Sequence, residues 1–121
     1  MKRLSFLFLA IVMLTGCIES FDAYLVRRRM ERQTYVNTHP ELSENVKTAI
    51  KEGHLLIGMT EDQVKIIRGA PDEINYTTTA YGSSEQWVYG HMAGTHYSTD
   101  DYLIPDYFLY FEHGLLTAIQ D

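Results

Sequence analysis

Hydrophobic and polar residues follow three different patterns along the chain. Residues 4–14 are an almost unbroken apolar run. Apolar residues recur at helical spacing in residues 40–53 and again after Thr60. From Glu73 onward apolar and polar residues alternate, as they do in strands with one buried face. The pattern predicts an apolar leader, then two helices, then a sheet.

The first predicted helix covers residues 40–53. Pro40 suits a first helical turn, because a backbone N–H would have no helical partner there, and Gly53 favours a C-terminal stop. The apolar stripe of this helix consists of Leu42, Val46, Ala49 and Ile50. We expect this stripe to face a core.

The second predicted helix begins at a capping box. The hydroxyl of Thr60 can accept from the backbone N–H of Gln63, whose own side chain can reach back to the N–H of Thr60. Gly69 followed by Pro71 is expected to end the helix. The predicted buried residues are Met59, Val64 and Ile67.

The alternating part of the sequence predicts an antiparallel meander. Strands are expected at residues 74–79, 86–89, 107–111 and 115–119, with turns at residues 81–84 and at His113-Gly114. Residues 91–104 are predicted to form a polar loop, and Trp87 is predicted to lie in the core. The predicted fold class is therefore α+β, with two helices packed on one face of a three- or four-stranded antiparallel meander.

The N-terminal residues have the organisation of a lipoprotein signal peptide. A basic pair, Lys2-Arg3, precedes the apolar run, which is too short to span a bilayer as a helix. Leu14-Thr15-Gly16-Cys17 then resembles the bacterial lipobox, in which the cysteine thiol accepts the lipid. We therefore predict that residues 1–16 are a lipoprotein signal peptide and that Cys17 is lipidated.

Lipidation determines the expected location. Two or three acyl chains, at about 0.8 kcal/mol per buried methylene, anchor a protein in a membrane essentially permanently. Ile18 rather than an aspartate follows the cysteine, so we expect an outer-membrane lipoprotein that faces the periplasm. Because the only cysteine carries the anchor, the mature chain is not expected to contain a disulfide, a cysteine nucleophile or a thiolate metal ligand.

The charge balance argues against nucleic acid as a partner. The chain carries 10 basic and 16 acidic residues, and its net charge is −6. Removal of residues 1–16, which contain Lys2 and Arg3 but no acidic residue, makes the net charge −8. A nucleic-acid-binding domain needs a basic surface instead.

We expect residues 17–39 to form a basic tether between the anchor and a domain at residues 40–121. The arginines of this tether are Arg27, Arg28, Arg29 and Arg32. They are candidates for contact with anionic phospholipid head groups, and the alternative is a solvated charge run. One helical face of the tether, which allows a short interfacial helix, carries Phe21, Tyr24, Leu25 and Arg28.

The sequence offers little for catalysis. Nitrogen and carboxylate candidates for a metal site are His91, His96, Asp100, Asp101 and Asp106, but their spacing fits no rigid ligand template. The serines near histidines lack a nucleophile elbow, and no phosphate-binding loop or dinucleotide fingerprint is present. We therefore predict a protein that is not an enzyme and has no metal or cofactor.

Tyrosine is the residue type that points to partner binding. The chain contains nine tyrosines, most of them between Tyr76 and Tyr110. Amphipathic rings contact a partner at low entropic cost, although cross-strand packing also explains many tyrosines in a sheet. Tyr81, Tyr97 and Tyr102 lie in or beside predicted turns and loops and are the candidates for partner contact.

Several residues that shape the predicted fold occur in the order of a known family. The matching segments are Ile57-Gly58-Met59-Thr60, then Val64, Gly69-Ala70-Pro71, Tyr81-Gly82 before Gln86-Trp87-Val88-Tyr89, and the closing hairpin at residues 108–119. Over residues 54–121 this order resembles the SmpA/OmlA lipoprotein family, which includes the small lipoprotein subunit of the outer-membrane β-barrel assembly machine. The resemblance implies a fold-specifying role for Gly58, Met59, Thr60, Val64, Gly69, Pro71 and Trp87.

The resemblance also implies a function. A member of this family would be a non-catalytic module that binds other envelope proteins, the β-barrel assembly machine among them, and phosphatidylglycerol as an anionic phospholipid. Residues 34–44 contain no equivalent of the Gln-Gly-Asn-Tyr-like stretch with which the assembly-machine subunit contacts its partner, so a paralogue with another partner fits as well. The predicted arrangement also resembles the repeat of secreted β-lactamase inhibitor proteins. The alternative is therefore a periplasmic inhibitor or ligand-binding module.

Overall fold

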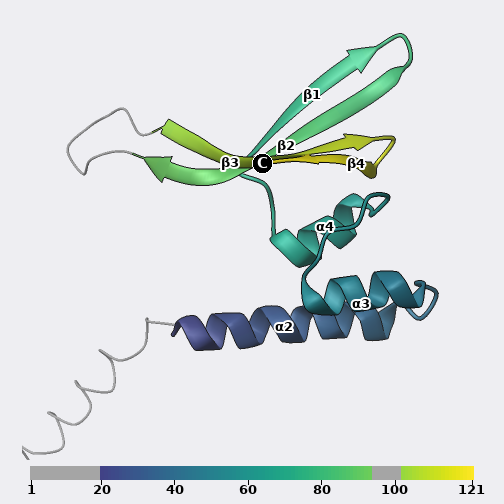
Figure 1. Ribbon diagram of the computed structural model, residues 1–121, viewed down its shortest axis with the longest axis vertical. Coiled ribbons are helices and arrows are strands. Elements are labelled where there is room, and N and C mark those ends of the chain that lie inside the picture. Colours follow the sequence, from purple (N-terminus) through teal and green to yellow (C-terminus); the bar gives the residue numbers. More distant parts are fainter. Residues whose placement is uncertain (1–19, 94–101) are drawn as a thin grey trace, which may run out of the picture. The chain divides into compact units, whose positions relative to one another are not determined.

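In the computed structural model, which describes residues 20–93 and 102–121, three helices precede a four-stranded antiparallel sheet (Figure 1). The helices are α2 (Phe21–Thr38), α3 (Glu44–Glu52) and α4 (Glu61–Arg68). The strands are β1 (Glu73–Thr79), β2 (Gly82–Ala93), β3 (Tyr102–Glu112) and β4 (Leu115–Gln120). The α+β class and a four-stranded meander are thereby confirmed. The predicted signal peptide and Cys17 lie outside the described residues.

Contacts divide the chain into two units, Met1–Met30 and Glu31–Asp121. We call the described part of the first unit, Ser20–Met30, the arm, and the second unit the domain. Helix α2 runs across the boundary between the two units, and its last two turns belong to the domain, where Val36 is buried and Tyr35 is half-buried. The prediction of a tether up to residue 39 therefore overlaps a helix. The sequence allowed a short interfacial helix at the start of this segment, but the full length of α2 was not predicted, because Val36 in its last part is its only buried residue.

Helix α3 begins later than its apolar pattern suggested. The Ser43 hydroxyl accepts a hydrogen bond from the N–H of Val46 and caps the helix, so Pro40 lies in the preceding turn and its predicted place in the first helical turn was wrong. The C-terminal stop at Gly53 is confirmed, because its φ of 79° and ψ of 28° are left-handed. Arg32 lies beside this end of α3: a Cβ built on Gly53 would be 3.6 Å from Arg32 Cζ.

Helix α4 has the predicted capping box. The Thr60 hydroxyl accepts from Gln63 N–H at 3.3 Å, and Gln63 Oε1 accepts from Thr60 N–H at 3.0 Å. At the other end the helix ends at Gly69, as expected, with a positive φ of 84° and a ψ of −175° that is extended rather than left-handed helical. Such a conformation is essentially restricted to glycine, so a side chain at Gly69 would be strained.

The strands pair in the order β1-β2-β3-β4 and place one face of the sheet against the helices. Cross-strand partners such as Trp87 and Leu109 share that face. The buried core is formed by Val36, Ala49, Ile50, Met59, Val64, Ile67, Trp87, Tyr89, Leu109, Phe111 and Leu116. The predicted core positions of Trp87, Val64 and Met59 are thus confirmed.

A short segment before α4 also pairs with the sheet. Gly58 N–H donates to the carbonyl of Leu116 at 2.7 Å, and Leu116 N–H donates to the carbonyl of Met59 at 2.8 Å. Gly58 has a φ of 92°, which favours glycine and allows the tight approach to α4 that its position suggested. The segment therefore covers the beginning of β4 and ties the helices to the sheet.

Strands β2 and β3 are longer than predicted. His91–Ala93 and Tyr102–Ile104, which were assigned to a polar loop, pair with each other as strand ends. Composition alone misses them, because polar residues such as His91 are held in the strand by cross-strand hydrogen bonding. The remainder of the predicted loop, with Tyr97, His96, Asp100 and Asp101, lies outside the described residues.

Candidate interaction groove

A β-bulge in β3 interrupts its pairing with β2. Tyr89 pairs with Tyr107, but the next residue of β2, Gly90, pairs with Pro105, so Asp106 is an extra residue in β3. A Cβ on Gly90 would overlap the carbonyl oxygen of Ile104, which explains why a glycine occupies this position. Bulges of this kind re-aim side chains and are common beside functional sites.

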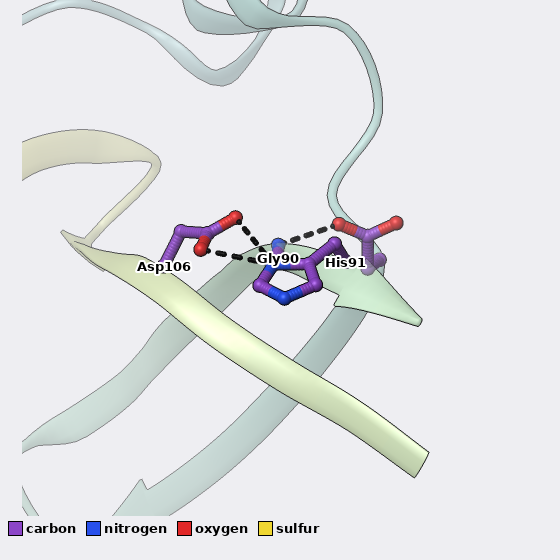
Figure 2. Close-up of polar contacts among 4 residues, drawn as sticks. Gly90, His91 and Asp106 are labelled. Carbon is purple, nitrogen blue, oxygen red and sulfur yellow. Dashed lines mark hydrogen bonds and ion pairs between the residues drawn. The ribbon is translucent and has the colours of Figure 1, made fainter. Parts of the chain in front are cut away.

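Three hydrogen bonds surround the bulge (Figure 2). His91 Nδ1 donates to the carboxylate of Asp106, at 3.1 Å from Oδ1 and 3.3 Å from Oδ2. Gly90 N–H donates to Oδ2 of Asp72 at 2.9 Å, while Asp72 N–H donates to the carbonyl of Val88 at 2.9 Å. Asp72 thus extends the β1–β2 ladder with its side chain, and Asp106 is held at the surface of the sheet.

A stacked pair of tyrosines lies next to the bulge. The rings of Tyr89 and Tyr107 are 4.9 Å apart and almost parallel, at 8°. Tyr89 Oη donates to the carbonyl of Gly69 at 2.9 Å, and Arg68 Cζ lies 5.9 Å from the centroid of Tyr107. Burial raises the pKa of both phenols, and Arg68 partly opposes this increase in pKa at Tyr107. Both phenols therefore stay neutral at physiological pH, and that of Tyr89 acts as a hydrogen-bond donor.

Arg68, Asp106 and Tyr107 line a groove with a volume of about 610 Å³. The groove is completed by His54, Leu55, Ile119 and Asp121. The connection between α3 and α4, the end of α4, and strands β3 and β4 all contribute to it. The lining thus combines charged groups of both signs with the apolar side chains of Leu55 and Ile119 and the Tyr107 ring. A mixture of apolar and charged side chains that includes an arginine and a tyrosine is typical of protein-binding sites.

A smaller hollow of about 270 Å³ lies at the two hairpin turns. Tyr81 in the β1–β2 turn lines it and is 95% exposed. His113 in the β3–β4 turn lines it too and has a φ of 53°, which is uncommon for a residue other than glycine. Two chain turns that are distant in sequence therefore present exposed side chains together.

The tyrosines predicted to contact a partner do not form one surface. Tyr81 lies at the turn end of β2, whereas Tyr102 pairs with Ala93 at the opposite end of that strand and is 62% exposed. Tyr97 lies outside the described residues. Tyr81 and Tyr102 therefore lie at opposite ends of β2 and do not belong to one contact surface.

The arm contains exposed apolar side chains and three of the four arginines that were predicted to contact lipid head groups. Arg27, Arg28 and Arg29 follow Tyr24, whose ring lies 5.7 Å from Arg27 Cζ. Phe21 is 73% exposed and Met30 is 64% exposed. The fourth arginine, Arg32, belongs to the domain, and its Nε is buried without a hydrogen-bond partner among the described residues. Arg32 therefore differs from the other three in its surroundings.

The groove itself was not predicted from the sequence. Asp106 was considered only as a metal ligand, and Arg68 and Tyr107 were not singled out. An isolated glycine inside a strand pattern indicates a bulge, so Gly90 was the available clue. In the part of the chain that the structure describes, no group of three histidine, cysteine or acidic side chains is arranged to hold a metal ion.

Comparison with known proteins adds no family assignment. No protein-family model matches the chain, and searches of curated proteins and of solved structures find no match either. None of the helices within residues 20–93 and 102–121 has the length and apolar character needed to cross a membrane.

Proposed function

We propose that this chain is a non-catalytic outer-membrane lipoprotein, anchored through Cys17 and facing the periplasm, that acts as a protein-interaction module in envelope integrity or outer-membrane protein assembly. The groove is the observation that carries the proposal. Its lining combines apolar side chains with Arg68, Asp106 and His54, and these groups can bind a partner segment without any reacting centre.

The arm supports the membrane part of the proposal. Arg27, Arg28 and Arg29 give it a concentrated positive charge in a chain of net charge −6, and Phe21 and Met30 are exposed on the same short helix. Such a segment suits the surface of an anionic bilayer, where each arginine contributes about 1 kcal/mol. We infer that the arm lies against lipid head groups next to the acylated Cys17. The protein partners belong to the envelope, and the β-barrel assembly machine is the first candidate.

The size of the groove favours a second candidate function, that of a periplasmic inhibitor or ligand-binding module. A volume of about 610 Å³ lies within the range of roughly 300–1,000 Å³ that is usual for small-ligand sites. This function predicts a stoichiometric soluble enzyme or ligand for the chain without its acyl chains. If a broad pull-down of periplasmic contents recovers neither, this candidate is rejected.

Affinity purification from solubilised membranes tests the main proposal. Arg68 and Lys65 are both basic residues of α4 that lie over aromatic rings, but only Arg68 lines the groove. We expect the unsubstituted chain and Lys65→Glu to recover the same envelope protein, and Arg68→Glu to recover at most about a tenth as much, because a reversed charge in the groove lining disfavours the partner. Equal recovery by Arg68→Glu and Lys65→Glu, or no reproducible partner, contradicts the proposal.

A further inference from the structure

Strand β1 has an open edge. It pairs with β2 over its whole length, from Glu73↔Val88 to Thr79↔Gly82, and lies at one edge of the sheet (Figure 1). No other strand of the described residues pairs with it. Along its other side every second residue therefore presents a backbone N–H and C=O that can pair with an added strand.

The usual protections of an edge strand are missing from β1. Its seven residues, Glu73–Thr79, include no proline, the β1–β2 register has no shift, and the only charge is that of Glu73 at the first position. Natural sheets normally protect their edges with charges, prolines or bulges. Its side chains are instead mostly threonine, tyrosine and isoleucine, which favour extended structure, and Tyr76 is 69% exposed.

The opposite edge of the same sheet is protected. Strand β4 has a register shift against β3, and its beginning is covered by the segment Gly58–Thr60 through hydrogen bonds to Leu116. The two edges therefore differ, and within the described residues only β1 offers an uninterrupted line of main-chain groups. A partner that binds along this edge must itself be an extended strand.

The sequence of β1 is complementary to itself. In an antiparallel pair of two β1 strands centred on Tyr76, each Ile74 lies opposite a Thr78 and the two Tyr76 rings lie opposite each other. These residues are on the face of the sheet that carries the core. On the other face each Asn75 lies opposite a Thr77. The only charged residue, Glu73, meets Thr79, so no like charges are opposed.

We propose that two copies of this chain associate through their β1 strands, antiparallel and centred on Tyr76, so that one continuous sheet runs through both copies. A two-fold axis perpendicular to the sheet relates the copies and makes the interface the same on each side. The contact is smaller than the roughly 1,600 Å² of a standard stable interface, so it forms where copies are concentrated, as on a membrane surface. This association involves neither the groove nor its partner.

Cysteine crosslinking of the full chain in membranes tests the pairing. With Tyr76→Cys, mild oxidation should give a disulfide-linked homodimer, because the two thiols face each other across the axis. Ala118→Cys on β4 is the matched control, since Ala118 is exposed but lies on the other edge strand. A Tyr76→Cys dimer yield no greater than that of Ala118→Cys or of the unsubstituted chain, or a disulfide to a different protein in place of the homodimer, overturns the proposal.

A pair of charge variants tests the register. In the Tyr76→Cys chain, Asn75→Lys with Thr77→Glu places opposite charges across the axis, whereas Asn75→Lys with Thr77→Lys places like charges there. The dimer yield should be kept by the first combination and fall about tenfold in the second, because like charges directly opposite destabilise paired strands. Both combinations lose the same Asn75 hydrogen bond to Gln86, so an equal folded fraction by circular dichroism isolates the charge effect. Equal dimer yields contradict the register.

Discussion

Two tyrosines beside the groove show how burial controls the charge of single residues. Tyr89 is buried in the core and Tyr107 stacks on it, and burial raises the pKa of both phenols above the ordinary value of 10.0. Their hydroxyl groups remain protonated in the folded chain at a pH at which an unfolded chain would release the protons. Arg68, which lines the groove, lies 5.9 Å from the ring centroid of Tyr107 in this neutral pair.

The stability of the domain should therefore fall at alkaline pH. Below about pH 10 the folded and unfolded chains both keep these protons, so the two phenols add no pH dependence. Above it the unfolded chain binds fewer protons than the folded one, and the free energy of unfolding decreases as the pH rises. Urea unfolding between pH 8 and about pH 11 measures this slope.

The variant Tyr89→Phe tests whether Tyr89 causes the loss of stability at alkaline pH. We expect a shallower alkaline slope together with a loss of about 1 kcal/mol at neutral pH, because the hydrogen bond to Gly69 disappears. Tyr81→Phe, at the exposed turn, is the control and should leave the profile unchanged. An alkaline slope that is the same in Tyr89→Phe and in the unsubstituted chain would refute this assignment.

At the scale of elements, the start of α4 links local and tertiary structure. The side chain of Thr60 caps the helix, while its backbone forms an isolated bridge with Leu115 of β4. Removal of the Thr60 hydroxyl leaves this backbone bridge in place, so the resulting change in the free energy of unfolding measures the contribution of the cap alone. A capping hydroxyl is worth about 1 kcal/mol.

Thr60→Ala should lower the free energy of unfolding by about 1 kcal/mol, and Thr60→Ser should lower it by much less, because serine keeps the accepting oxygen. The midpoints of urea unfolding compare the two variants directly. If alanine and serine give the same midpoint, the capping box contributes nothing to stability.

Elements whose ends are determined by neighbouring side chains were predictable from the sequence. Thr60 and Gln63 specify the start of α4, and Gly53 specifies the end of α3, through contacts within one turn. The start of α3 and the lengths of β2 and β3 were not predicted correctly. Both Pro40 and Ser43 suit the start of α3, and the structure uses Ser43 as the cap. The lengths of β2 and β3 depend on cross-strand pairing, such as that of His91 with Ile104. Neither the choice of cap nor the cross-strand pairing produces a hydrophobic period in the sequence.

The groove depends on the whole molecule. Its lining comes from the α3–α4 connection, from α4, and from strands β3 and β4, which are far from these two helices in sequence. Asp106 lines it because of a bulge, and Arg68 does so because α4 packs on the sheet face that carries Tyr107. Sequence patterns predicted the existence of α3, α4 and the four strands and the burial of Trp87 and Val64. They contain no information on the distance between residues from different elements, such as those that line the groove.

The arm, rather than the net charge of the chain, is expected to determine binding to anionic membranes. In residues 18–121, replacing Arg27, Arg28 and Arg29 with glutamine should weaken binding to anionic vesicles about 100-fold, at about 1 kcal/mol per arginine, and leave the weak binding to zwitterionic vesicles unchanged. A control with the same change in charge replaces Lys47, Lys51 and Lys65 of the domain. Co-sedimentation measures both variants. Equal weakening by the two triple substitutions would assign the attraction to net charge rather than to the arm.

Photo-crosslinking in intact cells tests the central claim most directly. A photo-reactive residue is placed in the full chain at Ile119, which lines the groove, or at the adjacent Ala118, which pairs with Tyr110 on the opposite face of the sheet. A partner bound in the groove predicts an adduct with one envelope protein from Ile119, absent from Ala118 and lost when Arg68→Glu is added. No adduct from Ile119, or the same adduct from Ala118, would contradict the account.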